Sequence, residues 1–220
     1  IGSRFEPQAY DNELPPQMVE LSSYRIARLP VSNAEYLAFI EDGGYQNSDF
    51  WIYEATHKQA EKKSAPFHWH KDSNDAWFGI GLNGPVDLIA ADPVQGLNHH
   101  EASAFANWAA SLGGETEGAV LQHEYQWETA VRTQEIKEFG RAWEWCANSF
   151  WPYSEYQAPT APQPATKDFG EQKRSLRGGC LHSQQSLRRP SLRNRAMPHW
   201  NFIFAGARLV FPPGTPFWEK

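Results

Sequence analysis

Three stretches of the chain have the polar and apolar pattern of an amphipathic helix. Ser32 and Glu35 form a capping box at the start of the first stretch, and Asn98 and Glu101 form one at the start of the second. A pair of glycines ends each of these two helices. The third helix is predicted from about residue 123 to residue 132. The residues that share the apolar faces are Tyr36, Phe39 and Ile40 in the first, Ala102, Phe105, Ala106 and Ala109 in the second, and Trp127, Ala130 and Val131 in the third.

Short apolar runs bounded by turn residues predict strands between and after these helices. We expect a hairpin with strands at residues 17–21 and 24–27, a strand at 65–70 and another at 77–80. The C-terminal run at 202–210 has two strand-like pieces separated by a glycine, which predicts a kink or bulge. A loop crowded with arginines is expected before this run. The mixture of helices and short strands predicts an α+β fold.

The composition fits one loop-rich domain that covers residues 1–220. Aromatic residues make up 14% of the chain, ten of them tryptophan, and there are 16 glycines and 16 prolines. This composition favours short strands, long loops and about three helices over a helical bundle. The formal net charge of -6 argues against a nucleic-acid-binding surface. No apolar run reaches the roughly 20 residues that a bilayer span requires, so no membrane partner is expected.

The two cysteines, Cys146 and Cys180, have no metal-binding spacing. We expect both to be small buried side chains of a protein in the reducing setting of the cytoplasm. The chain shows no signal peptide and begins at Ile1 rather than at a methionine. We therefore expect it to be a processed piece or a segment of a longer product.

The C-terminal part of the sequence carries several motifs in a fixed order. Trp143-Glu144-Trp145 is followed by Leu176-Arg177-Gly178-Gly179, then by Arg193-Asn194, and finally by FAGARLV at residues 204–210. This order resembles the C-terminal signature of the formylglycine-generating-enzyme-like family, and the ergothioneine-biosynthesis branch of that family fits best. PVSNAEYLAFIEDGGY at residues 30–45 resembles the family's first helix, so the resemblance extends over nearly the whole chain. It implies a C-type-lectin-like fold.

The resemblance also implies a role in ergothioneine or selenoneine biosynthesis. In the non-haem iron sulfoxide synthases of this branch, iron(II) and oxygen couple a thiol or selenol to the imidazole carbon of a histidine betaine. Their iron-binding histidines come from an additional N-terminal helical domain, whose histidine motif does not occur in this chain. We therefore expect a substrate-binding C-terminal domain that receives iron(II) from such a domain or from a partner subunit and is inactive alone. The alternative is a non-catalytic lectin-fold module that binds a ligand or a protein.

Two histidine pairs are the candidates for a metal site within the chain itself. His68 and His70 are two residues apart and would leave the same face of a strand. His99 and His100 are adjacent near the start of a helix. Neither pair has a third ligand at a suitable spacing, so we predict no metal site from these residues.

Copper-dependent formylglycine chemistry is not expected either. The resemblance places the two copper-binding cysteines of that chemistry at Ser183 and Arg188. Neither side chain offers the thiolate that copper(I) prefers.

Several residues are candidates for a substrate site. The resemblance assigns Asn194 to the betaine and one tyrosine, Tyr153 or Tyr156, to proton donation. Arginines can clamp a carboxylate and an indole can form an apolar wall, and the residues proposed for these roles are Arg188, Arg193, Arg195 and Trp200. Each also has an ordinary explanation: an asparagine that bonds its own loop, packed tyrosines, and arginines paired with local acids. We predict that the site residues line one concave surface beside an exposed apolar patch.

Overall fold

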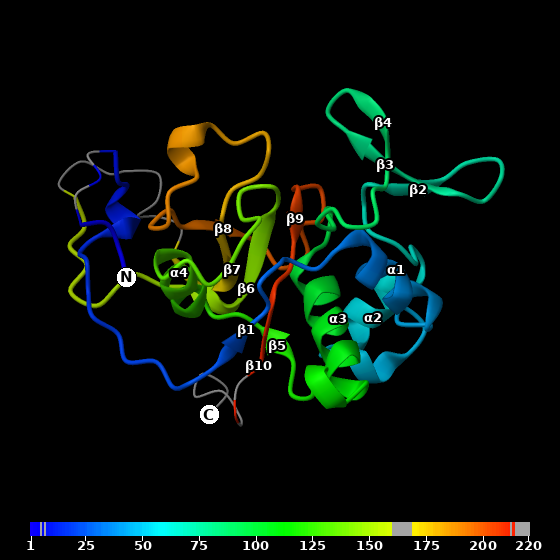
Figure 1. Cartoon of the computed structure of the whole chain (residues 1–220), viewed down its shortest axis with the longest axis horizontal. Coiled ribbons are helices and arrows are strands. Elements are labelled where there is room, and N and C mark those ends of the chain that lie inside the picture. The colour runs from blue at the N-terminus through cyan, green and yellow to red at the C-terminus, as the bar shows by residue number, and fades with distance from the viewer. Residues whose placement is uncertain (5, 7, 160–168, 212, 214–220) are drawn as a thin grey trace.

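The computed structural model describes residues 1–4, 6, 8–159, 169–211 and 213. In Figure 1 three helices gather on one side of the central strands and the fourth lies on the other side. They are α1 (Asn33–Glu41), α2 (Glu54–Glu61) and α3 (His99–Ser111) on the first side, and α4 (Glu124–Arg132) on the second. None of the helices in this described part has the length and hydrophobicity that crossing a bilayer requires.

Capping residues mark the starts of three of the four helices. Ser32 and Asn98 begin α1 and α3 in the predicted capping boxes, and His123 caps α4 by accepting a hydrogen bond from the Tyr125 N–H at 3.1 Å. The sequence pattern missed α2, whose N-cap residue Tyr53 makes no side-chain capping bond. The part of the chain that the structure describes therefore has four α-helices where about three were predicted.

The central sheet has four strands in the order β8-β7-β6-β9. The strands β8 (Asn194–Ala196), β7 (Gly170–Arg177) and β6 (Trp143–Phe150) are antiparallel, and β9 (Ala205–Gly206) runs parallel to β6. The strand β8 lies within the stretch that the sequence pattern assigned to an arginine-rich loop. At residue 206 a Cβ atom would lie 2.2 Å from the carbonyl oxygen of Val94. Glycine is needed there because β9 packs against the segment that precedes α3.

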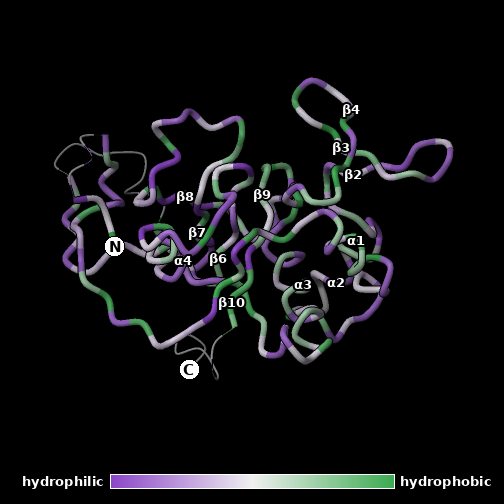
Figure 2. The backbone as a smooth tube through the Cα atoms, viewed as in Figure 1, coloured by the Kyte–Doolittle hydropathy of each residue, from purple (hydrophilic) through white to green (hydrophobic). Residues whose placement is uncertain are grey.

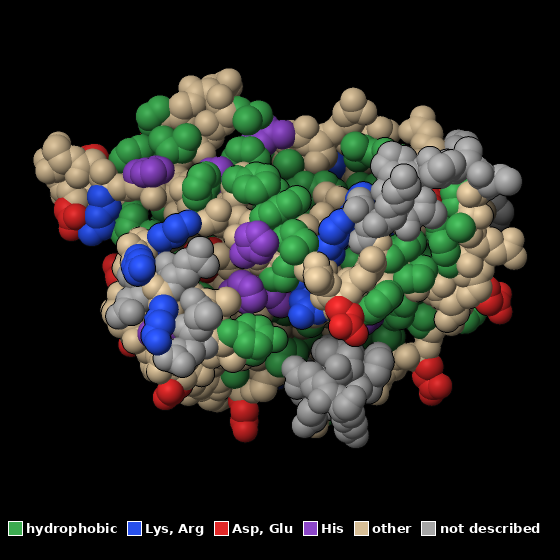
Figure 3. Space-filling view, turned by 180° about the vertical axis from the view of Figure 1, so that it is seen from behind, with side chains coloured by type: hydrophobic (Ala, Val, Ile, Leu, Met, Phe, Trp, Pro, Cys, Tyr) green, Lys and Arg blue, Asp and Glu red, His purple; other side chains and the backbone are tan. Residues whose placement is uncertain are grey.

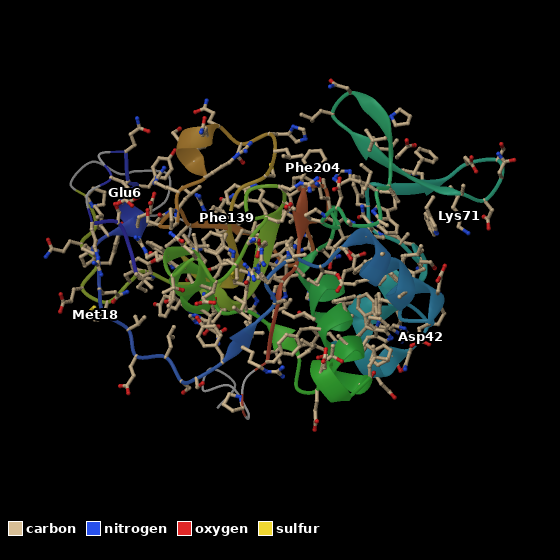
Figure 4. The ribbon with its side chains drawn as sticks, in the orientation of Figure 1. Glu6, Met18, Asp42, Lys71, Phe139 and Phe204 are labelled. Atoms are coloured by element: carbon tan, nitrogen blue, oxygen red, sulfur yellow. The ribbon has the colours of Figure 1, made fainter. Side chains whose placement is uncertain are left out.

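A second sheet joins residues from the beginning and the end of the described chain. The strands β1 (Arg25–Ile26) and β5 (Val120–Leu121) flank β10 (Leu209–Phe211), in a hydrophobic part of the molecule (Figure 2). The predicted hairpin within residues 17–27 is wrong, because residues 17–21 form no strand and β1 pairs with β10 instead. Met18 lies on the outer N-terminal segment and is 88% exposed (Figure 4), so it adds little to the core.

A third, three-stranded sheet projects from the body of the molecule (Figure 1). It consists of β2 (Trp69–Lys71), β3 (Trp77–Gly81) and β4 (Gly84–Asp87), all antiparallel. The strand predicted at residues 77–80 is confirmed, whereas the one predicted at 65–70 begins only at its end. Phe204 lies at the base of this sheet (Figure 4). The His68 ring stacks on it, with ring centroids 4.7 Å apart. This contact holds the projecting sheet to the segment before β9.

The main core packs aromatic rings between α1 and α3. The rings of Tyr36, Phe39 and Phe105 lie with centroids 5.3 to 5.9 Å apart, and all three are buried. They belong to the apolar faces that the helical pattern predicts. Cys146 and Cys180 are also buried and unpaired, as expected.

Candidate functional site

The central sheet separates two faces with different chemistry. Asn194 is paired with Leu176, and Leu176 with Trp145, so these three side chains lie on the same face. Leu176 and Trp145 belong to the main core, which α3 covers. Arg193 and Arg195 are one residue away from Asn194 along the chain and point to the opposite face, toward α4.

The face toward α4 is a closed layer of ion pairs. Arg193 Nε and Nη2 donate to the two carboxylate oxygens of Glu124, each at 2.8 Å, and Arg177 pairs with Glu128. All four side chains are buried. Burial alone would raise the pKa of Glu124, but the Arg193 and Arg177 guanidinium groups lower it to about 2. Arg193 also donates to two backbone carbonyls, so all three of its nitrogens are directed at protein acceptors.

The candidate catalytic residue Tyr153 lies in this same buried layer. It is 2% exposed, its ring centroid is 4.1 Å from the guanidinium carbon of Arg193, and its hydroxyl donates to Glu128 at 3.4 Å. Burial raises the pKa of Tyr153 well above its ordinary value. The structure therefore does not bring Tyr153 and Asn194 to one concave surface, and the catalytic role of Tyr153 stays a prediction.

Two other candidates are bonded to nearby parts of the chain. The Tyr156 hydroxyl donates to Asp11 at 2.7 Å, and burial together with that carboxylate raises the pKa of Tyr156 to about 12. Arg188 donates to two carbonyls of its own loop, those of Leu181 and Ser183, at 2.7 and 3.1 Å. The Arg188 contacts are local, whereas the Tyr156 contact joins its loop to the N-terminal segment, and both are structural contacts of the kind expected if these residues do not bind substrate.

The last two candidates, Arg195 and Trp200, lie in different surroundings. The Arg195 guanidinium lies 5.9 Å from the centroid of the Phe150 ring on the α4 face. Trp200 is 38% exposed, and its ring lies 5.3 Å from that of Phe202, which is 53% exposed. Trp200 therefore offers an apolar surface to solvent, although on a segment distant in sequence from the tyrosines.

The face that carries Asn194 also carries histidines. The His99 N–H at the start of α3 donates to the Pro198 carbonyl at 2.9 Å and so ties α3 to the segment that follows β8. Burial and the nearby Arg174 charge lower the pKa of His99 to about 3 and that of His100 to about 4. Both imidazoles are therefore neutral at pH 7 and can each donate and accept a hydrogen bond. We call the surface formed by Asn194, Arg174, His99, His100 and His199 the histidine face.

Two cavities adjoin the histidine face. The smaller one, of about 130 Å³, borders the start of α3 and is lined by residues that include Trp51, Lys63, Asn98, His100, Glu101 and His199. The larger one, of about 260 Å³, lies between the start of α4 and β6 and includes Arg174 in its lining. Figure 3 shows histidine side chains across the middle of one face of the molecule, with hydrophobic side chains between them.

The described residues do not fit a three-ligand iron site. Among them no group of three or more histidine, cysteine, aspartate or glutamate side chains is placed to hold a metal ion. His68 is stacked on Phe204 and within 3.2 Å of the Phe202 carbonyl, which leaves it apart from His99 and His100. Whether iron(II) reaches a site next to this chain stays a prediction.

Sequence reasoning missed Arg174 and His199 as members of this face. Neither residue belongs to a motif that the sequence singles out. What places Arg174 is the register of β7 and β8, in which it lies opposite Ala196 and two positions from Asn194, and His199 lies in the segment that follows β8. That register depends on strand pairing between distant segments, which periodicity does not specify.

Comparison with known proteins identifies the family. Residues 2–140 match the model of the sulfatase-modifying factor enzyme 1-like domain. The chain belongs to this family. The resemblance inferred from the C-terminal motifs is therefore confirmed by a match over the other part of the chain.

The similar proteins of this family include hercynine oxygenases. The chain is 30% identical to the hercynine oxygenase of Mycobacterium tuberculosis over 96% of its own length and 58% of that protein's. It is 31% identical to the hercynine oxygenase of Mycolicibacterium thermoresistibile, over 94% and 54% of the two lengths. The chain thus spans little more than half of the relatives that it matches.

The structural comparison confirms the fold class. PvdO from Pseudomonas aeruginosa superposes with a TM-score of 0.65 and covers 96% of this chain and 89% of its own. Its sequence identity is 13%, so this likeness concerns the fold alone. The domain is therefore a loop-rich α+β structure of the sulfatase-modifying factor type, as the sequence predicts.

Proposed function

We propose that this chain is the substrate-binding domain of an enzyme of the hercynine-oxygenase type. The observation that carries the proposal is the similarity to hercynine oxygenases along at least 94% of the chain, at 29 to 31% identity. An alignment over nearly the whole chain favours a shared role more than a match to one motif would. The chain would act in the ergothioneine pathway or in its selenium counterpart.

The histidine face is the proposed binding surface for the histidine betaine. Asn194 offers a donor and an acceptor to the carboxylate and imidazole of such a substrate. The neutral imidazoles nearby add hydrogen-bonding groups that carry no charge themselves, and the Arg174 guanidinium in the same face can face the carboxylate of the betaine. The ion-pair layer on the opposite face would serve to hold β8, and with it Asn194, in position.

Iron(II) would come from outside this chain, because the described residues do not assemble three suitable ligands. When bound next to the substrate, iron(II) would supply the oxygen-dependent redox chemistry. We assign to the chain itself the binding and orientation of the betaine. A helical iron-binding domain or subunit is the partner that this division of roles requires.

The rival function is a non-catalytic module that binds a ligand or a protein through the same scaffold. The same lack of a three-ligand cluster favours it. The two proposals differ in whether product forms when iron is available.

The test is turnover by the native gene product, purified with all of its domains or subunits. It would be incubated with iron(II), oxygen, histidine betaine and cysteine, and the products would be separated and weighed by mass spectrometry. We expect a product in which the imidazole carbon has gained the sulfur substituent, and we expect Asn194→Ala to slow its formation at least about tenfold. If the betaine is bound but no product forms with any thiol or selenol, the rival function replaces ours.

A further inference from the structure

We propose that the larger cavity, between the start of α4 and β6, binds a small carboxylate through Arg174. Arg174 also belongs to the histidine face, but neither Asn194 nor iron takes part in the site proposed here, which lies in the cavity beside α4. The cavity is lined by residues 123–125 at the start of α4, residues 147–149 of β6, Trp151 and Arg174. Arg174 reaches it from the neighbouring strand β7.

Arg174 is a partly buried cation without an acidic partner. Its Nη1 donates to the Ser149 hydroxyl, and no carboxylate in the described part of the chain pairs with it. Its Nε is buried and has no hydrogen-bond partner. Four other buried arginines have their charge compensated by a glutamate: Arg177 by Glu128, Arg189 by Glu13, Arg193 by Glu124, and Arg208 by Glu144. The Arg177 Nε also has no hydrogen-bond partner, so the missing carboxylate is what sets Arg174 apart. Because a buried unpaired donor is unfavourable, Arg174 is suited to an acceptor supplied by a ligand.

The guanidinium group also has a suitable shape. With Nη1 on Ser149, the guanidinium edge formed by Nε and Nη2 has no acceptor among the residues that the structure describes. A carboxylate matches such an edge with two parallel hydrogen bonds, and lysine could not reproduce this geometry. Phosphate can form the same two bonds, so the geometry favours an anion, and the preference for a carboxylate rests on the size and polarity of the cavity.

The charges around the cavity favour an anion as well. Glu124 lines the cavity, but its carboxylate is already paired with Arg193. Three arginines, Arg132, Arg177 and Arg193, share only Glu124 and Glu128. The ion-pair layer behind the cavity thus carries more positive than negative charge before Arg174 is added.

The rest of the lining limits the kind of carboxylate. Burial lowers the pKa of His123 to about 4, so this imidazole is uncharged at pH 7. The Asn148 amide is held by Glu124 on both its oxygen and its nitrogen. Trp151 is 50% exposed and offers an apolar wall. One cation, neutral polar groups and an indole in about 260 Å³ fit a monocarboxylate with a small aromatic or apolar body.

The test is a titration of the protein with phenylacetate, acetate and inorganic phosphate, followed by calorimetry and by the Nε–Hε signals of the arginines in an NMR spectrum. We expect phenylacetate to bind saturably and to shift one Nε–Hε signal. The spectrum of Arg174→Lys should lack that signal, which assigns it to Arg174. Phenylacetate should bind more tightly than acetate, and phosphate more weakly than either. Arg174→Gln should weaken phenylacetate at least tenfold.

The control is Arg25→Gln, which removes an exposed arginine that lies over Phe211 and is not part of the lining of this cavity. It should leave the affinity for phenylacetate unchanged. A second variant, Trp151→Ala, should weaken phenylacetate but not acetate, and it keeps the test informative if Arg174→Gln does not fold. No saturable binding, equal binding by Arg174→Gln, or a preference for phosphate would each overturn the proposal.

Discussion

At the scale of single residues, hydrogen bonding and burial have opposite effects on the pKa of Glu101. As the third residue of α3 it accepts a hydrogen bond from the Asn98 N–H at 2.8 Å, and it accepts another from the Tyr45 hydroxyl at 3.0 Å. The Tyr45 hydroxyl is in turn 3.0 Å from that of Tyr36. Both bonds to Glu101 favour the ionised carboxylate, yet burial raises its pKa to about 7. Burial wins because the side chain is 1% exposed and no cation lies within ion-pair distance among the described residues.

This conflict predicts a dependence of stability on pH. The folded-state pKa of Glu101 lies above the value of 4.5 for the unfolded chain. Protonated Glu101 therefore contributes its full share to the free energy of unfolding below pH 4.5, and this share is lost as the pH rises to 7. The loss amounts to about 3 kcal/mol at roughly 1.4 kcal/mol per pKa unit. Urea unfolding of the wild type and of Glu101→Gln across this range should show that the variant lacks this decrease.

A matched control is Glu35→Gln, which removes a carboxylate from the exposed capping box of α1. It measures the loss of the cap alone. If Glu101→Gln and the wild type lose stability in parallel between pH 4.5 and 7, Glu101 is ionised throughout and the explanation is wrong.

At the scale of secondary-structure elements, the ion pairs join α4 to two strands of the central sheet. Glu124 and Glu128 lie on α4, Arg177 ends β7, and Arg193 precedes β8. Removal of one partner from such a buried pair leaves an uncompensated charge, which costs roughly 3–5 kcal/mol. The attachment of β8 therefore depends on complete pairs rather than on any one residue.

A double-mutant cycle tests this layer. Glu124→Gln and Arg193→Gln should each lower the unfolding free energy by about 3 kcal/mol or more. The double variant should cost less than the sum by about 1–3 kcal/mol, because neither charge is left alone. As a control, Arg141→Gln breaks a partly exposed pair with Asp92 and should cost about 1 kcal/mol or less. Additive losses at Glu124 and Arg193 would show that the pair does not act as a unit.

Elements whose ends are marked by side chains could be predicted, and those defined by pairing could not. Ser32, Asn98 and their glutamates located α1 and α3, whereas α2 begins at Tyr53, which gives no capping signal. The strand β1 pairs with β10, and nothing in either segment specifies a partner nearly two hundred residues away. The stretch around Asn194 was predicted as a loop, so the alternation that separates it from Arg193 was not considered.

At the scale of the whole molecule, the motifs gave the family and the fold but not the layout of the site. The order from Trp143 to Val210 was sufficient to identify the domain. It was not sufficient to show that Asn194 and Tyr153 lie on opposite sides of the central sheet, because that depends on the register of three strands. Motifs can therefore suggest the residues of a site, but the strand pairing of the sheet must be known before one can say which of them lie on the same face.

The ligands available in the described part of the molecule predict weak binding of iron(II). After anaerobic loading with iron(II) and removal of excess metal, the chain alone should retain far less than one iron per chain, because the described residues lack a three-ligand cluster. Metal analysis by mass spectrometry measures this directly. One tightly held iron per chain that is lost in His99→Ala or His100→Ala would reveal a site within the histidine face.

The central claim is that this domain itself binds the histidine betaine, and iron-free titration calorimetry tests it most directly. We predict saturable binding that Asn194→Ala weakens by about tenfold or more, as expected when about 1.4 kcal/mol of hydrogen bonding is lost. Asn74→Ala, in the exposed turn of the projecting sheet, should bind like the wild type. Absence of saturable binding, or equal affinity in the wild type and Asn194→Ala, would contradict the account.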